Sequence, residues 1–161
     1  SADGLDTKIH LTKIESAQEM YKACSEIFTT CDAAILSAAV ADYRPASQED
    51  QKIKKKTEEF NLELVKTVDV LKSLGEIKKK HQFLAGFALE TQNEQENALL
   101  KLEKKNLDFI ILNSMNDKGA GFGKDTNKIT ILEKNGKKHT FETKPKKDVA
   151  IDIVNLLATY L

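Results

Sequence analysis

The segment that decides the fold is FLAGFALETQNEQENALLKLEKKNLDFIILN, residues 83–113. It contains two short apolar runs, Phe83 to Leu89 and Leu107 to Leu112, which are typical of strands buried on both faces of a sheet. Between them, Thr91-Gln92-Asn93-Glu94 has the pattern of a capping box and predicts a helix that reaches Lys105. A strand, a helix and a second strand in this order predict two parallel strands joined by a crossover helix.

The alternation of strands and helices continues on the N-terminal side of this segment. Ala33 to Ala41, AAILSAAVA, is a third apolar run and predicts another buried strand, which the polar Asp42-Tyr43-Arg44-Pro45 would end in a turn. Before it, residues 9–11 alternate apolar and polar side chains and predict a short strand. Ser16-Ala17-Gln18-Glu19 is a capping box, so a helix is expected to follow it.

A loop, a strand and a helix are expected between residues 46 and 80. Residues 46–56 are polar and charged without a helical or strand period, which predicts an exposed loop. Residues 60–64 alternate apolar and polar side chains and predict a short strand. Thr67 is expected to cap a helix that runs toward Lys80, with Asp69 in the first turn, where its charge suits the helix dipole.

The C-terminal part of the chain predicts a hairpin followed by a helix. Ile129 to Leu132 and His139 to Phe141 are expected strands, and Asn135-Gly136 between them is a strong hairpin signal. Lys146 to Leu161 predicts an amphipathic helix. The fold class is therefore α/β: a three-layer, Rossmann-like domain of residues 1–161, in which a largely parallel sheet carries helices on both faces and a C-terminal β-hairpin.

The composition excludes several classes of protein. Lys and Arg number 25, as do Asp and Glu, so the chain has no net charge that would recruit nucleic acid or a membrane surface. No apolar run approaches the length of a membrane span, and we expect a cytoplasmic protein. Cys24 and Cys31 form no CxxC motif and have no histidine at metal-ligand spacing, so they are expected to be packing residues.

Three of the apolar runs end in a polar residue, namely Asp42, Glu90 and Asn113. In open α/β sheets, ligands bind outside the carboxyl ends of the strands, and parallel pairing would bring these three residues to one edge. Each could bind a ribose hydroxyl, a base edge or a metal ion, and each considered alone could equally be a turn former or a helix cap. Small residues such as Ala38 and Gly86 would admit a planar ligand or else allow a helix to pack tightly on the sheet.

Lysines offer candidate phosphate contacts near the same edge. Lys101 and Lys105 lie four residues apart, hence on one face of a helix, where they could grip one polyphosphate. Lys52 and the lysines at 54–56 could close over phosphates as a lid. The alternative for both groups is a solvated surface, on which Lys101 and Lys105 would only complement the helix dipole.

Other chemistries find less support in the sequence. Gly119-Ala120-Gly121-Phe122-Gly123 lacks the third spaced glycine of a dinucleotide-binding fingerprint and precedes a predicted strand instead of a helix. The histidines, His10, His81 and His139, are scattered at the ends of predicted elements, which disfavours a histidine-centred triad or metal site. No residue stands out as a covalent nucleophile.

Several motifs follow one another along almost the whole chain: AAVADYRP (residues 38–45), KIKKK (52–56), VDVL (68–71), GFALET (86–91), KLEKKNLDFIILN (101–113), Gly121-Phe122 and Asn127-Lys128-Ile129. In type and order they resemble phosphopantothenate-cysteine ligase (phosphopantothenoylcysteine synthetase), the C-terminal domain of the bacterial bifunctional decarboxylase/synthetase of coenzyme A biosynthesis. Any one motif would be weak, but together and in order they are specific.

This resemblance implies a reaction. CTP would activate the carboxylate of 4′-phosphopantothenate as an acyl-cytidylate and release pyrophosphate, and the amine of L-cysteine would then displace CMP. Mg²⁺ and lysines would neutralise the pyrophosphate charge, so no covalent nucleophile is needed. The resemblance also implies a homodimer, and it places FMN only in a fused decarboxylase domain, which this sequence does not contain.

The resemblance also assigns residues. Lys52 would come from the lid and serve catalysis, and the nucleotide would contact Ser37, Ala38, Asp42, Lys52, Val68, Asp69, Val70, Leu71, Phe87, Lys101 and Lys105. Metal ligands are not assigned. The family opens with a glycine-rich segment that ends in an Asn acting on the acyl intermediate, and the sequence has no counterpart of it. The chain is thus expected to be truncated at its N-terminus and weak or inactive in turnover.

Two other functions remain open at this stage. A non-catalytic nucleotide-binding or flavin-associated α/β module would use the same strand-end residues for binding only. A nicotinamide-dependent oxidoreductase is disfavoured because the dinucleotide fingerprint is missing.

Overall fold

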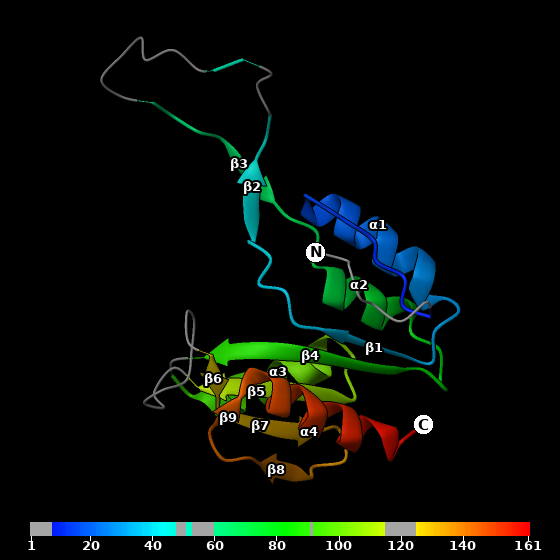
Figure 1. Cartoon of the computed structure of the whole chain (residues 1–161). Coiled ribbons are helices and arrows are strands. Elements are labelled where there is room, and N and C mark those ends of the chain that lie inside the picture. Colours follow the sequence, from blue (N-terminus) through cyan, green and yellow to red (C-terminus); the bar gives the residue numbers. More distant parts are fainter. Residues whose placement is uncertain (1–7, 48–50, 53–59, 91, 115–124) are drawn as a thin grey trace.

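The computed structural model describes residues 8–47, 51–52, 60–90, 92–114 and 125–161. Its centre is a five-stranded sheet in the order β1-β4-β5-β7-β8 (Figure 1). The strands are β1 (Ala33–Leu36), β4 (Phe83–Glu90), β5 (Phe109–Ser114), β7 (Ile129–Glu133) and β8 (Lys138–Thr140). β1, β4 and β5 are parallel, whereas β7 and β8 are antiparallel to their neighbours. The predicted mostly parallel sheet with a C-terminal hairpin is confirmed.

Helices cover both faces of the sheet. They are α1 (Ala17–Phe28), α2 (Val70–Ile77), α3 (Glu94–Lys104) and α4 (Lys146–Ala158). One apolar core joins Phe28 of α1, Leu74 of α2 and Leu102 of α3 to side chains of the sheet. A second core lies between α4 and the opposite face, where Val149 and Ile153 are buried. Successive side chains of a strand point to opposite faces, so each central strand supplies both cores.

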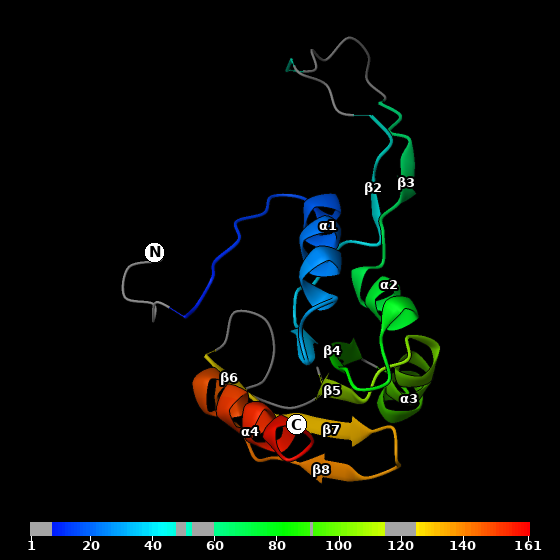
Figure 2. The same cartoon turned by 90° about the vertical axis from the view of Figure 1, so that its right-hand side faces the viewer.

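Two small antiparallel ribbons lie outside the main sheet. β2 (Tyr43–Pro45) pairs with β3 (Leu64–Lys66), and this ribbon extends away from the body of the domain (Figure 2). β6 (Thr126–Asn127) pairs with β9 (Lys144–Pro145) beside the start of α4.

Three strand predictions need correction. Of residues 33–41, only β1 is a strand, because pairing with β4 ends at Leu36 and the small side chains that follow have little apolar surface to bury. Residues 9–11 lie in no strand, and among the described residues no neighbouring strand supplies the hydrogen bonds that they would need. Of residues 60–64, only Leu64 belongs to β3, and the apolar side chains of Phe60 and Leu62 are exposed.

The helix starts were predicted with mixed success. Ser16 caps α1, since its hydroxyl accepts a hydrogen bond from the backbone N–H of Glu19. Thr67 does not cap α2: Asp69 is the N-cap and accepts from the N–H of Lys72, and α2 ends at Ile77 instead of running toward Lys80. The backbone N–H of Thr67 instead donates to the carbonyl of Asp42, which ties it to the projecting ribbon.

The start of α3 also differs from the prediction. Asn93 is the N-cap, with a positive φ of 45° and no side-chain cap bond, so α3 begins two residues later than a cap at residue 91 would place it. Thr91, the first residue of the predicted capping box, lies outside the described residues. The reason is that β4 continues through Glu90, one residue beyond the apolar run, which leaves little chain before the helix. β5 is likewise shifted, because Leu107 still closes the end of α3 by donating to the carbonyl of Leu102.

The remaining predictions concern the hairpin, the last helix and the cysteines. The last helix begins at Lys146 as predicted but ends at Ala158, before Leu161. Gly136 has a φ of 88° in the β7–β8 turn, a left-handed conformation that favours glycine. Cys24 and Cys31 are free thiols packed against the first core, and burial raises the pKa of Cys24, which fits a packing role. Among the described residues, no helix has the length and apolar character needed to cross a membrane.

Candidate functional site

The carboxyl ends of the three parallel strands open into a cavity of about 670 Å³. Parallel register places Leu36 of β1 beside Gly86 of β4, which in turn lies beside Ile110 of β5, so the chain leaves all three strands on the same side. The cavity is lined by Ser37, Ala38, Ala39, Val40, Phe87, Ala88, Leu89, Lys101, Asn113, Asn127, Lys146, Val149, Ala150 and Ile153. We call it the larger pocket, by comparison with a smaller one that adjoins it.

A smaller pocket of about 140 Å³ adjoins it. Its walls come from the chain after β1 and from the start of α2: Met20, Leu36, Ala38, Val40, Ala41, Asp42, Thr67, Val68, Asp69, Val70, Leu71, Phe87 and Lys105. Ala38, Val40 and Phe87 line both pockets. The two hollows therefore share a wall and can hold two parts of one extended ligand.

The predicted nucleotide contacts gather around these two pockets. Ser37, Ala38, Phe87 and Lys101 line the larger one, and Ala38, Asp42, Val68, Asp69, Val70, Leu71, Phe87 and Lys105 line the smaller one. Lys52 is an exposed residue that lies apart from both linings. The other lid lysines, at 54–56, and the glycine-rich segment 119–123 fall outside the described residues. The roles of all these residues stay predictions.

The three polar strand ends are not all in register. Glu90 belongs to β4 and Asn113 to β5, one position apart along the paired strands, because Glu90 is the partner of Ser114. Asp42 does not end β1: the strand stops at Leu36, and Asp42 lies just before β2. It still reaches the site as a lining residue of the smaller pocket.

Gly86 was open to two interpretations, and the packing one is correct. A Cβ at this position would lie 2.3 Å from Cδ2 of Leu71, so the absent side chain lets α2 pack closely on β4. Gly86 thus supports the site only indirectly, by seating the start of α2 against the sheet.

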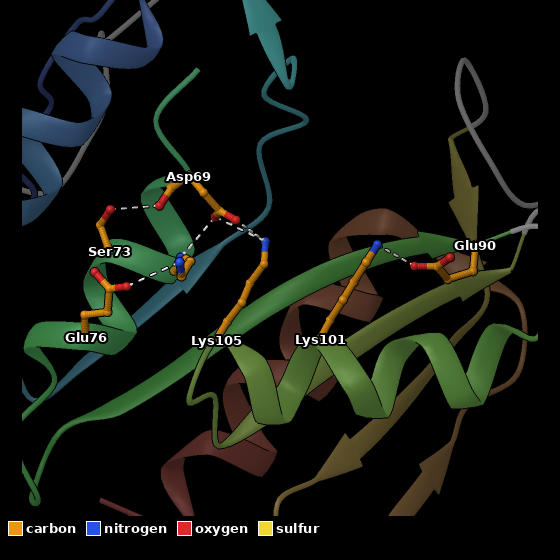
Figure 3. A network of polar contacts seen from close by, with 7 residues as sticks. Asp69, Ser73, Glu76, Glu90, Lys101 and Lys105 are labelled. Carbon is orange, nitrogen blue, oxygen red and sulfur yellow. Dashed lines mark hydrogen bonds and ion pairs between the residues drawn. The ribbon is translucent and has the colours of Figure 1, made fainter. Parts of the chain in front are cut away.

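Lys101 and Lys105 each make an ion pair that the sequence did not indicate (Figure 3). Lys101 Nζ donates to Glu90 Oε1 at 2.5 Å, and Lys105 Nζ lies 2.9 Å from Asp69 Oδ2. The two ammonium groups project from neighbouring turns of α3 toward different carboxylates. The partners are 11 and 36 residues apart in sequence, so no local pattern identifies them.

The electrostatics of Asp69 reflect this contact. Burial raises its pKa, but the hydrogen bonds from Lys105 and from the backbone N–H of Lys72, with the charges of both lysines, outweigh burial and hold the pKa below its ordinary value. Asp69 therefore remains a carboxylate at the rim of the smaller pocket.

Sequence reasoning missed the inner wall of the larger pocket. Asn127 of β6 and Lys146, Val149 and Ile153 of α4 line it, although the sequence indicated only a family motif without an assigned role at Asn127 and an amphipathic helix from Lys146. Asn113 also has a distinct feature: its Oδ1 is buried and has no hydrogen-bond partner among the described residues. An acceptor of this kind suits a ligand N–H or O–H donor.

A family comparison covers nearly the whole chain. Residues 3–161 match the family described as "DNA/pantothenate metabolism flavoprotein C-terminal domain". A protein named "Cysteine/Cysteine sulfinic acid decarboxylase", from an unknown prokaryotic organism, is 49% identical over 151 residues, which are 94% of this chain and 42% of that protein. The "Coenzyme A biosynthesis bifunctional protein CoaBC" of Bacillus subtilis (strain 168) is 45% identical over 145 residues, 90% of this chain and 36% of that protein.

Solved structures agree with this assignment. The C-terminal domain of a coenzyme A biosynthesis bifunctional protein CoaBC superposes with a TM-score of 0.74 at 37% identity, covering 97% of this chain and 71% of that one. A DNA/pantothenate metabolism flavoprotein from Streptococcus pneumoniae gives a TM-score of 0.72 at 21% identity, which shows the shared fold. The chain spans less than half the length of the two curated relatives named above. The family match confirms the resemblance found in the sequence, and the chain belongs to the DNA/pantothenate metabolism flavoprotein C-terminal domain family.

Proposed function

We propose that this domain acts in coenzyme A biosynthesis as a CTP-dependent ligase that joins 4′-phosphopantothenate to L-cysteine. The observation that carries the proposal is the convergence of separate segments on two adjoining pockets. The chain after β1, the start of α2, Phe87 of β4 and two lysines of α3 all line them. The CoaBC names of several relatives support the same pathway. We also propose a cytoplasmic location.

The proposed chemistry proceeds in two steps. A carboxylate oxygen of 4′-phosphopantothenate attacks the α-phosphorus of CTP, and the bond to pyrophosphate breaks. The cysteine amine then attacks the acyl carbon, CMP leaves with the former carboxylate oxygen, and the amine loses a proton as the amide forms. Lys101 and Lys105 are suited to bind the phosphates and stabilise the pyrophosphate charge as it develops.

Magnesium fits the donor set around the smaller pocket. Mg²⁺ commonly takes one or two carboxylates together with substrate phosphates and waters. Asp42 offers such a carboxylate, whereas the described residues contain no group of three His, Cys, Asp or Glu that could hold an ion by themselves. The ion would be held by Asp42 and the nucleotide together, and it would supply charge neutralisation to the phosphates.

Isothermal titration calorimetry of the 161-residue chain with CTP and Mg²⁺ tests the nucleotide site. We expect saturable binding that Lys101→Ala weakens by about tenfold or more, because a charge-assisted hydrogen bond is lost. Lys104→Ala is the matched control, since Lys104 is an exposed neighbour on α3 away from both pocket linings. No heat with CTP would refute the proposed site, and heat with NADH alone would favour an oxidoreductase.

A flavin-associated or purely binding module is the second candidate. It is favoured by the word flavoprotein in the family description and by the decarboxylase name of one relative. Lys52→Ala separates the two functions, because a ligase needs phosphate neutralisation in the transition state. The ligase predicts that turnover falls far more than CMP binding, whereas equal losses, or FMN binding by this chain, would favour the second candidate.

A further inference from the structure

The ion pairs of Lys101 and Lys105, drawn in Figure 3, differ in which partner is the more exposed to solvent. In the first pair, the side chain of Glu90 is only 12% exposed, whereas that of Lys101 is 46% exposed. In the second pair, the order is reversed, with Asp69 at 43% and Lys105 at 23%. The two lysines therefore present their charges to an approaching anion in different ways.

Glu90 is placed to form an ion pair with Lys101 that persists when an anion binds. Its carboxylate lies at the end of β4, where the backbone is fixed by pairing with β5, and it accepts from Lys101 Nζ at 2.5 Å. Leaving a largely buried carboxylate without its partner costs free energy. An anion would thus find it easier to join this pair than to pull Lys101 away from Glu90.

Lys101 keeps donor capacity while it is held. A lysine ammonium carries three N–H donors, and the contact with Glu90 uses one of them. The half-exposed side chain also lines the larger pocket. No other contact among the described residues uses the remaining two N–H groups, so they can donate to a ligand. Fixing a long side chain in advance removes part of the entropy that binding would otherwise cost.

Asp69 relates differently to Lys105. The carboxylate is the more exposed partner and also caps α2 through the N–H of Lys72, whereas the Lys105 side chain is only 23% exposed. A phosphate that approaches Lys105 from solvent therefore meets less of the lysine than of its carboxylate partner. Lys101 is consequently the lysine that is ready for an anion.

We propose that Glu90 is a positioning residue for phosphate binding, because it holds the ammonium of Lys101, a lining residue of the larger pocket, with N–H donors that no other contact in the described part of the chain uses. This inference rests on the proposed nucleotide function. A phosphate of the nucleotide accepts from Lys101 while Glu90 stays bound to the same nitrogen.

The test compares the binding of CTP, CMP and pyrophosphate, each with Mg²⁺, to the 161-residue chain and to Glu90→Gln, Lys101→Ala and the double variant. Glu90→Gln keeps the side-chain shape and removes the charge that holds Lys101. We expect it to weaken CTP and pyrophosphate binding by about fivefold to tenfold, which corresponds to about 1 to 1.4 kcal/mol, and to affect CMP less. In the Lys101→Ala background, the same change should have no further effect.

Glu76→Gln is the matched control. Glu76 pairs with Lys72 at 3.5 Å in an exposed i,i+4 contact on α2, and neither residue belongs to the pocket linings. Unchanged or tighter CTP binding by Glu90→Gln would overturn the proposal, and tighter binding would mark Glu90 as a competing counter-ion. An equal loss in the Lys101→Ala background would show a merely structural role.

The pyrophosphate arm separates this inference from the proposed function. If the chain binds pyrophosphate but not CTP, and Glu90→Gln weakens pyrophosphate binding as expected, the positioning role is supported and the nucleotide function is rejected. If the chain binds CTP and Glu90→Gln has no effect on that binding, the nucleotide function is supported and the positioning role is rejected. Failure to bind either ligand would reject both.

Discussion

Glu133 lies at the end of β7, and the residue is only 2% exposed. It accepts hydrogen bonds from Tyr160 and from Asn135 Nδ2, and it contacts His139 Nε2 at 2.5 Å. Burial raises its pKa, but the bonds from Tyr160, His139 and Asn135 and the charge of His139 outweigh burial and hold the pKa below its ordinary value. This residue links the hairpin to the end of α4.

The first prediction concerns the stability that Glu133 provides. Glu133→Gln should lower the free energy of unfolding at pH 7 by about 2 kcal/mol, because bonds to a charged acceptor are lost. The folded-state pKa lies below the unfolded value of about 4.3, so the contribution is present above that value and is lost as pH falls through the folded-state pKa.

Urea denaturation at pH 7 and near pH 3 measures this effect. The stability difference between the wild type and Glu133→Gln should shrink in acid, and Glu142→Ala, at an exposed position, should change little at either pH. A difference that is independent of pH would mean that the charge of Glu133 contributes nothing.

Asp69 is a second residue with two structural roles, since it caps α2 and forms an ion pair with Lys105. Asp69→Ala should lose about 1 kcal/mol of stability, and Asp69→Asn should lose less because Asn is also a good N-cap. Since the pKa of Asp69 is lowered by folding, its charge-dependent share should disappear as pH falls below about 3.9. Chemical denaturation of both variants checks this, and equal losses would argue against a capping role.

At the scale of secondary-structure elements, the contact of α2 with the end of α3 depends on Gly75. A Cβ on Gly75 would lie 1.9 Å from the backbone carbonyl oxygen of Lys105, and that carbonyl cannot move without α3. Asn106, which follows α3, donates from Nδ2 to the carbonyl of Gly75 at 3.0 Å and joins the end of α3 to α2. Asp69 and Lys105 are the N-cap of α2 and the C-cap of α3, so they belong to the same pair of elements.

Gly75→Ala should therefore destabilise the domain, although a Gly to Ala change in an unconstrained helix usually stabilises it. We expect a loss of about 3 kcal/mol, from overpacking against the backbone. Thermal melts would compare it with Gly86→Ala, whose Cβ would meet the movable end of the Leu71 side chain, so that a smaller loss is expected. Stability equal to that of the wild type would contradict the close helix contact.

At the scale of the whole molecule, the projecting ribbon exposes apolar side chains. Tyr43 of β2 and Leu64 of β3 are each more than half exposed, as are Phe60 and Leu62, which precede β3. Exposed apolar groups that cluster on one element commonly mark a protein interface. We propose this ribbon as the interface of the homodimer expected from the sequence.

The corresponding prediction is a particle of twice the 18.0 kDa chain mass in sedimentation velocity. Leu64→Glu should shift the population toward the monomer, because a charge placed in an apolar interface is costly. Leu100→Glu is the control, since Leu100 is an exposed leucine on α3, away from the ribbon. A monomeric wild type, or equal dissociation by both variants, would reject the ribbon as the interface.

The sequence by itself determined the order and type of most elements. Apolar runs such as Phe83 to Leu89 predict β4 because burial on both faces demands them, and Asn135-Gly136 predicts the hairpin because the turn needs a positive φ. It also identified the family, since its motifs follow one another in order. The site residues that line the pockets were named from those motifs, and their roles are still to be measured.

Only the tertiary structure decided what depends on neighbours distant in the chain. The apolar run from Ala33 stops being a strand at Leu36 because pairing with β4 ends there, and Asp69 takes the place of Thr67 as a cap because α2 begins only at Val70. The Glu90–Lys101 and Asp69–Lys105 pairs join separate elements. Local sequence sets backbone preference and hydrophobic period, whereas strand ends, caps and ion pairs form by competition among contacts that exist only once the chain has folded.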